Sequence, residues 1–183
     1  MNRVWKVAPA AVALVVGLTG CVSFGNDDKG KDGGPKTEAG RPVGAVATVD
    51  PNKVIAKATF DSQAAKGAKV EIGIVELRVV GKLADLTLSI TPRVPGDTSP
   101  NVYELNGNTD PDVSLIDTIN LKRYVVVKDS SGKQLQPDYI YVHLRNGQPN
   151  VQTYTFAAPP AGVRAVDVVF GQWPPFRNVP VTR

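Results

Sequence analysis

The alternation of apolar and polar residues with a period of two constrains the fold of this 183-residue chain more than any other feature. In residues 83–92, Leu86, Leu88 and Ile90 alternate with polar neighbours. A period of two is the signature of a β-strand that buries one of its faces. Residues 54–60 follow the same pattern, so we predict strands rather than helices for the main part of the chain.

One strand-like segment changes phase in its middle. Ile72 and Ile74 lie in one phase of the alternation, whereas Leu77 and Val79 lie in the other. One extra residue in a strand shifts the side chains after it to the opposite face. We therefore predict a β-bulge near Val75-Glu76.

The remaining segments support an all-β fold. Further strand-like runs lie at 124–127, 139–144, 152–156, 166–170 and 178–181. Asp129-Ser130-Ser131-Gly132 has the composition of a tight turn. After Gly44 the only helical turn that we expect lies within 111–120. About eight short strands between Gly and Pro residues predict an immunoglobulin-like antiparallel β-sandwich over residues 46–183.

The first 20 residues have the layout of a secretory signal peptide. Arg3 and Lys6 form a basic start, and Val7 to Leu18 is an uncharged apolar run. A run of about 12 residues is too short to cross the hydrocarbon core of a bilayer as a helix. We therefore expect residues 1–20 to be removed.

The end of this segment, Leu18-Thr19-Gly20-Cys21, resembles a bacterial lipobox. The resemblance implies that Cys21 receives a diacylglyceryl group and becomes the first residue of the mature chain. Cys21 is the only cysteine, and two acyl chains give a stable anchor where a single chain does not. We expect a lipid-anchored protein on the extracytoplasmic face of the cell membrane.

Residues 21–45 comprise this lipidated cysteine and a predicted flexible linker. Gly, Asp, Lys and Pro dominate from Val22 to Gly44, without apolar periodicity. Such a tract buries too little apolar surface to offset the entropy of ordering it. Removal of Arg3 and Lys6 lowers the basic residues from 21 to 19, against 17 acidic ones, so the side-chain charge falls to about +2. With no long basic block, we expect no nucleic-acid partner.

Composition also argues against catalysis and cofactor binding. The chain has one histidine, His143, and one cysteine, Cys21, which the lipobox already accounts for. It contains neither a G-x-S-x-G nucleophile motif nor a glycine-rich phosphate loop. We therefore predict that the protein is not an enzyme and has no cofactor.

A loop with alternating oxygen side chains is a candidate metal site. Asn106, Asn108, Asp110 and Asp112 resemble the ligand spacing of a calcium loop. However, Pro111 takes the position at which an EF-hand loop needs glycine. Since Asn, Asp, Gly and Pro are also ordinary loop residues, we assign no metal and keep calcium binding as an alternative.

Two aromatic segments are candidates for a binding surface. Tyr139, Tyr141 and His143 alternate with aliphatic residues, so they are predicted to line the outer face of a strand. There they could stack on a sugar or a protein partner, or simply cover neighbouring side chains. Trp173-Pro174-Pro175-Phe176 is predicted to pack across one end of the sandwich, because proline cannot donate to a strand ladder.

The order of these segments resembles a known domain. The resemblance rests on residues 83–92, 124–138, 152–170 and 171–181. They are similar to the telokin-like, immunoglobulin-like domain of bacterial lipoproteins, in the version found upstream of OmpA-like domains in Gram-positive secreted proteins. The resemblance covers roughly 69–181 and implies a fold without catalytic residues.

We therefore expect a membrane-anchored extracytoplasmic lipoprotein that acts as a non-catalytic interaction module in the cell envelope. Its partner would be an envelope protein or a cell-wall polymer. The alternatives are a structural spacer or assembly factor of an envelope complex, and a calcium- or glycan-binding domain.

Overall fold

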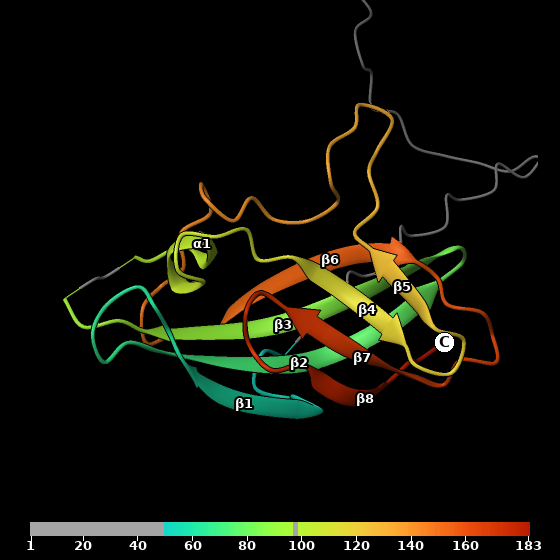
Figure 1. The fold of residues 1–183 in the computed structure, drawn as a ribbon, viewed down its shortest axis with the longest axis horizontal. Helices are drawn as coiled ribbons and strands as arrows, with labels where there is room; N and C mark the ends of the chain where they lie inside the picture. The colour runs from blue at the N-terminus through green and yellow to red at the C-terminus, as the bar shows by residue number, and fades with distance from the viewer. Residues whose placement is uncertain (1–49, 97–98) are drawn as a thin grey trace, which may run out of the picture. The chain divides into compact units, whose positions relative to one another are not determined.

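The fold is that of a computed structural model, which describes residues 50–96 and 99–183 (Figure 1). The predicted signal peptide, lipobox and linker therefore lie outside the described residues. Within the described part, no helix is long and apolar enough to cross a membrane.

Eight strands form two four-stranded antiparallel sheets (Figure 1). The first sheet has the order β1-β2-β3-β6, with β1 at Ala56–Asp61, β2 at Lys69–Val80, β3 at Leu83–Arg93 and β6 at Asn150–Ala157. The second has the order β5-β4-β7-β8, with β4 at Val113–Asp117, β5 at Lys122–Val125, β7 at Ala165–Phe170 and β8 at Phe176–Pro180. The chain crosses between the sheets after β3, β5 and β6, and such crossing is typical of immunoglobulin-like sandwiches. The all-β antiparallel sandwich predicted from the sequence is confirmed.

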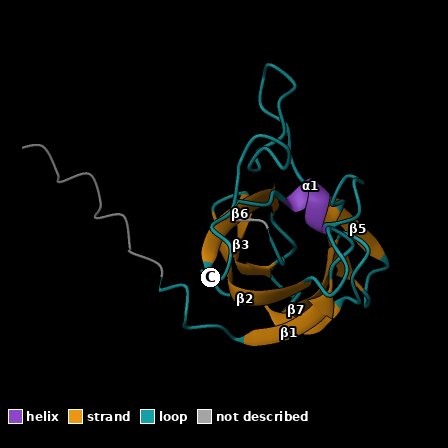
Figure 2. Ribbon diagram, turned by 90° about the vertical axis from the view of Figure 1, so that its left-hand side faces the viewer, coloured by secondary structure: helices purple, strands orange, loops and turns teal. Residues whose placement is uncertain are grey.

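The core lies between the two sheets, which Figure 2 shows from the end that carries the helix, and is mainly aliphatic. Leu86, Leu88 and Ile90 on β3 are fully buried, as their alternation predicts. Leu115 on β4 and Val168 on β7, in the second sheet, are also fully buried. Each sheet presents one apolar face, so neither could bury its side chains without the other.

The predicted β-bulge is present in β2. Ile74 pairs with Leu88 and Glu76 pairs with Thr87, which leaves Val75 without an opposite residue. The extra residue lets both Ile74 and Leu77 point into the core, where both are fully buried.

Hydrogen bonds bridge the two sheets along both of their long sides. Beyond the bulge, the Val79 amide donates to the Thr182 carbonyl at 2.8 Å, and the Thr182 amide donates to the Leu77 carbonyl at 2.9 Å. On the other side, the Val127 amide donates to the Thr155 carbonyl of β6 at 2.9 Å. These bonds use backbone groups that would otherwise form open sheet edges.

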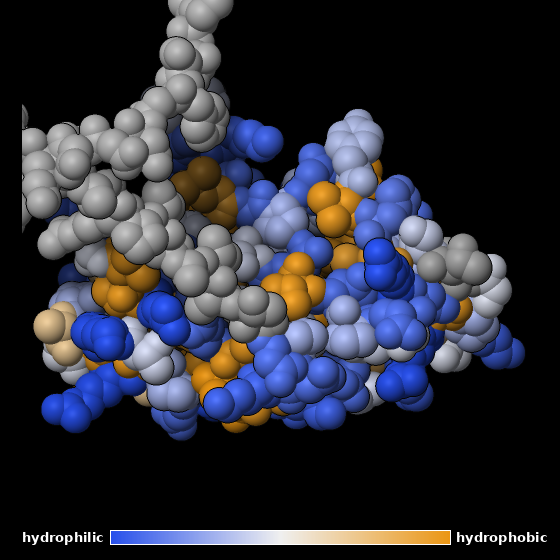
Figure 3. Space-filling view, turned by 180° about the vertical axis from the view of Figure 1, so that it is seen from behind, coloured by the Kyte–Doolittle hydropathy of each residue, from blue (hydrophilic) through white to orange (hydrophobic). Residues whose placement is uncertain are grey.

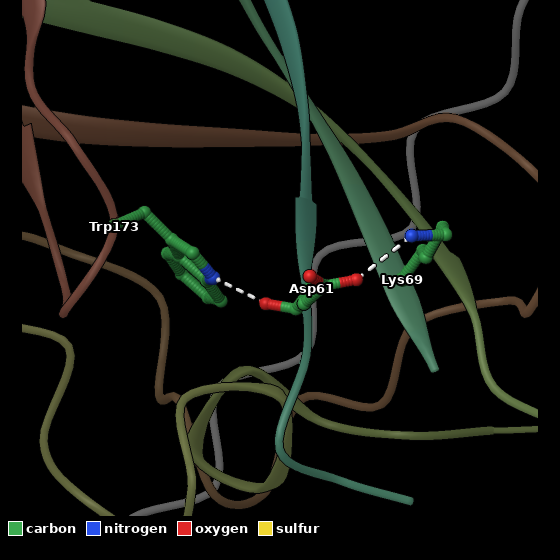
Figure 4. Close-up of polar contacts among 3 residues, drawn as sticks. All are labelled: Asp61, Lys69 and Trp173. Carbon is green, nitrogen blue, oxygen red and sulfur yellow. Dashed lines mark hydrogen bonds and ion pairs between the residues drawn. The ribbon is translucent and has the colours of Figure 1, made fainter. Parts of the chain in front are cut away.

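An aromatic cluster joins β1 to the segment before β8. The Trp173 indole nitrogen donates to the Asp61 carbonyl oxygen at 3.1 Å, and the Asp61 carboxylate pairs with Lys69 at 2.7 Å (Figure 4). The Trp173 ring lies 6.4 Å from that of Phe60 and 5.4 Å from that of Phe170, between ring centroids. The predicted packing of the 173–176 segment against the sandwich is confirmed.

The predicted helical turn within 111–120 is wrong, because Val113–Asp117 forms β4. The helix is α1, at Val102–Leu105. Its start is fixed by a capping box, in which the Asn101 side chain accepts from the Glu104 amide at 2.8 Å and the Glu104 carboxylate accepts from the Asn101 amide at 2.9 Å.

Gly73 tests how the segment before β1 packs. A Cβ at Gly73 would lie 2.7 Å from the Val54 Cγ1 atom, closer than carbon atoms approach. We expect Gly73→Ala to push Val54 off the sheet and to lower the free energy of unfolding by about 1 kcal/mol. It should also speed hydrogen exchange of the Ile55 amide, which donates to Ile74 at 2.8 Å.

Gly162→Ala is the matched control, because no atom lies within 4 Å of its Cβ position. Chemical denaturation and amide exchange would measure both variants. Equal stability and equal exchange at Ile55 in the two variants would contradict this packing.

Trp173→Phe tests the indole hydrogen bond. The variant keeps an aromatic ring but loses the donor to the Asp61 carbonyl, so we expect unfolding to become easier by about 1–2 kcal/mol. Tyr141→Phe, at a side chain that is 81% exposed, should stay within about 0.5 kcal/mol of the parent. An unchanged denaturation midpoint for Trp173→Phe would show that the bond contributes nothing.

Candidate functional site

The predicted lipidation residues cannot be placed in this fold. Leu18, Thr19, Gly20 and Cys21 all lie outside the described residues. The structure does place the two other candidate sites, the 106–112 loop and the 139–143 segment.

In the 106–112 loop, Asn106 is a structural residue. It is 2% exposed. Its side-chain oxygen accepts from the Gln172 amide at 2.9 Å, and its side-chain nitrogen donates to the Thr109 carbonyl at 2.9 Å. Asn106 therefore ties the loop to the segment between β7 and β8.

The other oxygen side chains of this loop do not share one centre with Asn106. Asp112 forms an ion pair with Arg123, and Asp110 lies beside Tyr139, where burial and then the Asp110 carboxylate raise the pKa of the tyrosine hydroxyl. Asn108 has a positive φ of 56°, which suits a turn residue. Within residues 50–96 and 99–183, no three acidic, histidine or cysteine side chains cluster as metal ligands. Calcium binding stays a prediction without geometric support.

The predicted strand at 139–144 is wrong, because residues 139–141 form a turn and His143 makes only an isolated bridge, to Asn101. The cause is Asp138, whose carboxylate accepts from the Ile140 amide at 2.9 Å and from the Tyr141 amide at 2.8 Å. These bonds hold the backbone in a turn that no strand ladder could accommodate. Of the three aliphatic residues expected in the core, only Leu144 is buried.

The turn separates the three side chains that the sequence predicts to form one stripe. Tyr139 is half-buried and stacks on Tyr103 of α1, with 6.4 Å between the ring centroids. Tyr141 points into solvent, and the His143 ring nitrogen Nδ1 lies 2.8 Å from the Ser99 carbonyl oxygen. These residues therefore do not form a continuous aromatic face.

Tyr139 instead lines a groove that contains residues of both predicted sites. The groove has a volume of about 220 Å³ and lies between the start of β4, the end of β5 and the segment after the 129–132 turn. Its polar lining is Asp110, Asp112, Gln134, Gln136 and Tyr139, and its apolar lining includes Val113, Val125 and Val126. A second hollow of about 200 Å³ shares Gln134, Gln136 and Tyr139 and continues along 137–140.

Two effects raise the pKa of the Tyr139 hydroxyl in this groove. Burial is the larger, and the nearby Asp110 carboxylate adds to it. A protonated tyrosine hydroxyl can donate a hydrogen bond to a ligand. Beside Tyr139, the side-chain nitrogen of Gln136 donates to the side-chain oxygen of Gln134 at 3.2 Å.

This arrangement suits the binding of a polar ligand. Two glutamine amides offer both donors and acceptors, and the Asp110 carboxylate offers acceptors. The tyrosine ring and the valines offer apolar contact. The groove can therefore hold a flat, hydroxyl-bearing group.

A second groove of about 220 Å³ lies on the outer face of β1, β2 and β3. Lys57 and Glu71 on its wall pair with each other at 3.5 Å. Ser89 and Thr91 line the groove and are almost fully buried. Arg93 also lines this groove and forms no ion pair within the described residues, so the groove keeps one positive charge, and no aromatic side chain lies in its lining.

Sequence reasoning missed Gln134 and Gln136 as candidate binding residues. Their spacing of two would place both side chains on one side of an extended segment. This spacing is the feature of the sequence that could have indicated them. Tyr103, on which Tyr139 stacks, gave no comparable signal because it lies 36 positions away in the chain.

Comparison with protein-family models, with curated protein sequences and with solved structures finds no match to this chain.

The Asp138 turn generates a prediction about pH. Hydrogen bonds from the Tyr141 and Ile140 amides lower the pKa of Asp138 in the folded state. Its contribution to stability is therefore present above the unfolded pKa of about 3.9 and is lost as pH falls through the lowered folded value. Asp138→Asn keeps an oxygen acceptor but cannot titrate.

We expect the urea midpoint of Asp138→Asn to depend less on pH than that of the parent between about pH 5 and pH 2.5. Denaturation curves at several pH values would measure the difference. Parallel pH profiles for the two proteins would contradict the role assigned to this carboxylate.

Proposed function

We propose that this chain is a membrane-anchored extracytoplasmic lipoprotein whose β-sandwich acts as a non-catalytic interaction module in the cell envelope. The observation that carries the proposal is the sequence Leu18-Thr19-Gly20-Cys21 behind a basic start and an apolar run. A thiol at this position is the acceptor that a diacylglyceryl group requires. The resemblance of the later segments to a domain of bacterial lipoproteins supports the same class.

The groove beside Tyr139 supports an interaction role for the sandwich. Its amide, carboxylate and aromatic groups match the hydroxyls and ring faces of a cell-wall polymer. A glycan-containing envelope polymer is therefore the partner class that we favour over an envelope protein. The alternative role, a spacer or assembly factor, needs no occupant in this groove.

The anchor is tested by Cys21→Ala. Without the thiol, we expect the protein to leave the membrane fraction or to retain residues 1–20 uncleaved. Thr19→Ala is the control, because it keeps a small residue in the lipobox and should leave anchoring intact. Cell fractionation with immunoblotting measures both variants, and full membrane retention of processed Cys21→Ala would refute the anchor.

The groove is tested by retention of residues 22–183 on isolated cell-wall sacculi, with and without added calcium. We expect Gln134→Ala/Gln136→Ala to reduce retention at least five-fold, because it removes both amides from the groove. Gln148→Ala, at an exposed glutamine outside the groove, should retain like the parent. No retention of the parent in either condition would favour the spacer role, and dependence on calcium would revive the 106–112 loop as a site.

A further inference from the structure

Two hairpin tips expose large aliphatic side chains. At the turn between β2 and β3, Val80 is 60% exposed and Leu83 is 40% exposed. At the turn between β4 and β5, Ile119 is 80% exposed and Leu121 is 89% exposed. Single exposed aliphatic residues are common, but here two tips each carry a pair.

The topology places both tips at the same end of the sandwich. The chain leaves the first tip along β3, turns at the opposite end near α1, and returns along β4 to the second tip. Figure 1 shows both turns at the end that also holds the C-terminus. In Figure 3, which views the molecule from behind, this end lies on the left and shows hydrophobic surface beside strongly hydrophilic surface.

The second tip is held in one conformation. The Asp117 carboxylate accepts from the Ile119 amide at 3.1 Å, the Asn120 amide at 3.0 Å and the Asn120 side chain at 2.7 Å. Leu121 adopts a positive φ of 53°, an unfavourable conformation for a branched, bulky residue. This backbone conformation and the turn at Asp117 together leave the Leu121 side chain in solvent.

The charge beside the aliphatic side chains is positive. Lys82 lies between Val80 and Leu83 in the first tip, Lys122 follows Leu121 in the second, and Arg164 lies in the neighbouring turn before β7. None of these three cations forms an ion pair within the described residues. The Asp117 carboxylate is buried, and hydrogen bonds from Asn120, together with the charge of Lys122, lower its pKa.

We propose that this end of the sandwich docks on the surface of a bilayer that contains anionic lipid. The four aliphatic side chains would enter the headgroup region, while Lys82, Lys122 and Arg164 face the lipid phosphates. We infer an anionic bilayer as the partner because both tips place exposed aliphatic side chains beside cations. An anchor at Cys21 would keep the bilayer within reach, since residues 22–49 can extend to about 95 Å.

This inference rests on the proposed function in one respect only, the anchor at Cys21. It can therefore be tested without the anchor. Residues 22–183 lack Cys21 but contain the whole described core, which runs from Ala56 to Val181. Vesicles of phosphatidylcholine alone, or with roughly one third phosphatidylglycerol, serve as the probe.

We expect residues 22–183 to sediment with the vesicles that contain phosphatidylglycerol and to be released by salt. Ile119→Ser/Leu121→Ser should weaken this binding at least ten-fold, and Lys82→Gln/Lys122→Gln should remove most of its dependence on salt. Ile140→Ser/Val142→Ser is the matched control, because Ile140 is 42% exposed and Val142 is 37% exposed, on a turn remote from both tips. Circular dichroism checks that every variant is folded.

Absence of binding by the parent to anionic vesicles, or an equal loss in the Ile140 and Val142 control, overturns the docking surface. A change of oligomeric mass in the Ile119 and Leu121 variant, without a change in vesicle binding, also overturns it and makes this end an interface between copies. Neither result bears on the proposed lipid anchor, which the fractionation of Cys21→Ala tests separately.

Discussion

The burial of one aliphatic face of each sheet against the other is the constraint on which this structure depends. Strand β2 shows how closely the rest is tied to it. Its first half pairs with β1, its second half bonds to the C-terminal segment at Thr182, and the extra residue Val75 keeps Ile74 and Leu77 in the core throughout. Without the bulge, the residues after Ile74 would turn their apolar side chains to solvent. The inserted residue thus lets both halves of β2 face the same core. It also lets the second half of β2 form hydrogen bonds with the C-terminal segment.

Period-two alternation was enough to predict the sandwich, the buried face of β3 and the bulge, because burial of one sheet face leaves that pattern directly in the sequence. It failed at 139–144, where the Asp138 carboxylate binds two backbone amides and makes a turn from a segment with strand-like alternation. It also missed α1, although Asn101 and Glu104 carry the spacing of a capping box. The groove beside Tyr139 could not be predicted, because its lining comes from three segments that only the tertiary fold brings together.

The two proposed surfaces are separated along β4. The groove lies at the start of that strand, beside Val113, and the hairpin tip follows its end at Asp117. A chain that touched the bilayer through its hairpin tips would hold the groove away from the lipid, where an envelope polymer could reach it. A lipid anchor, a docking end and a binding groove would then act together: the anchor holds the domain near the membrane and the docking end orients it.

The proposed role of this protein depends most on the chemistry at Cys21. The most direct test is intact-mass analysis of the protein extracted from membranes of cells that make the full chain. We predict a polypeptide that begins at Cys21 and carries the added mass of a diacylglyceryl group on its only thiol. A polypeptide that begins at another residue, or one with an unmodified Cys21 thiol in the membrane fraction, would contradict it.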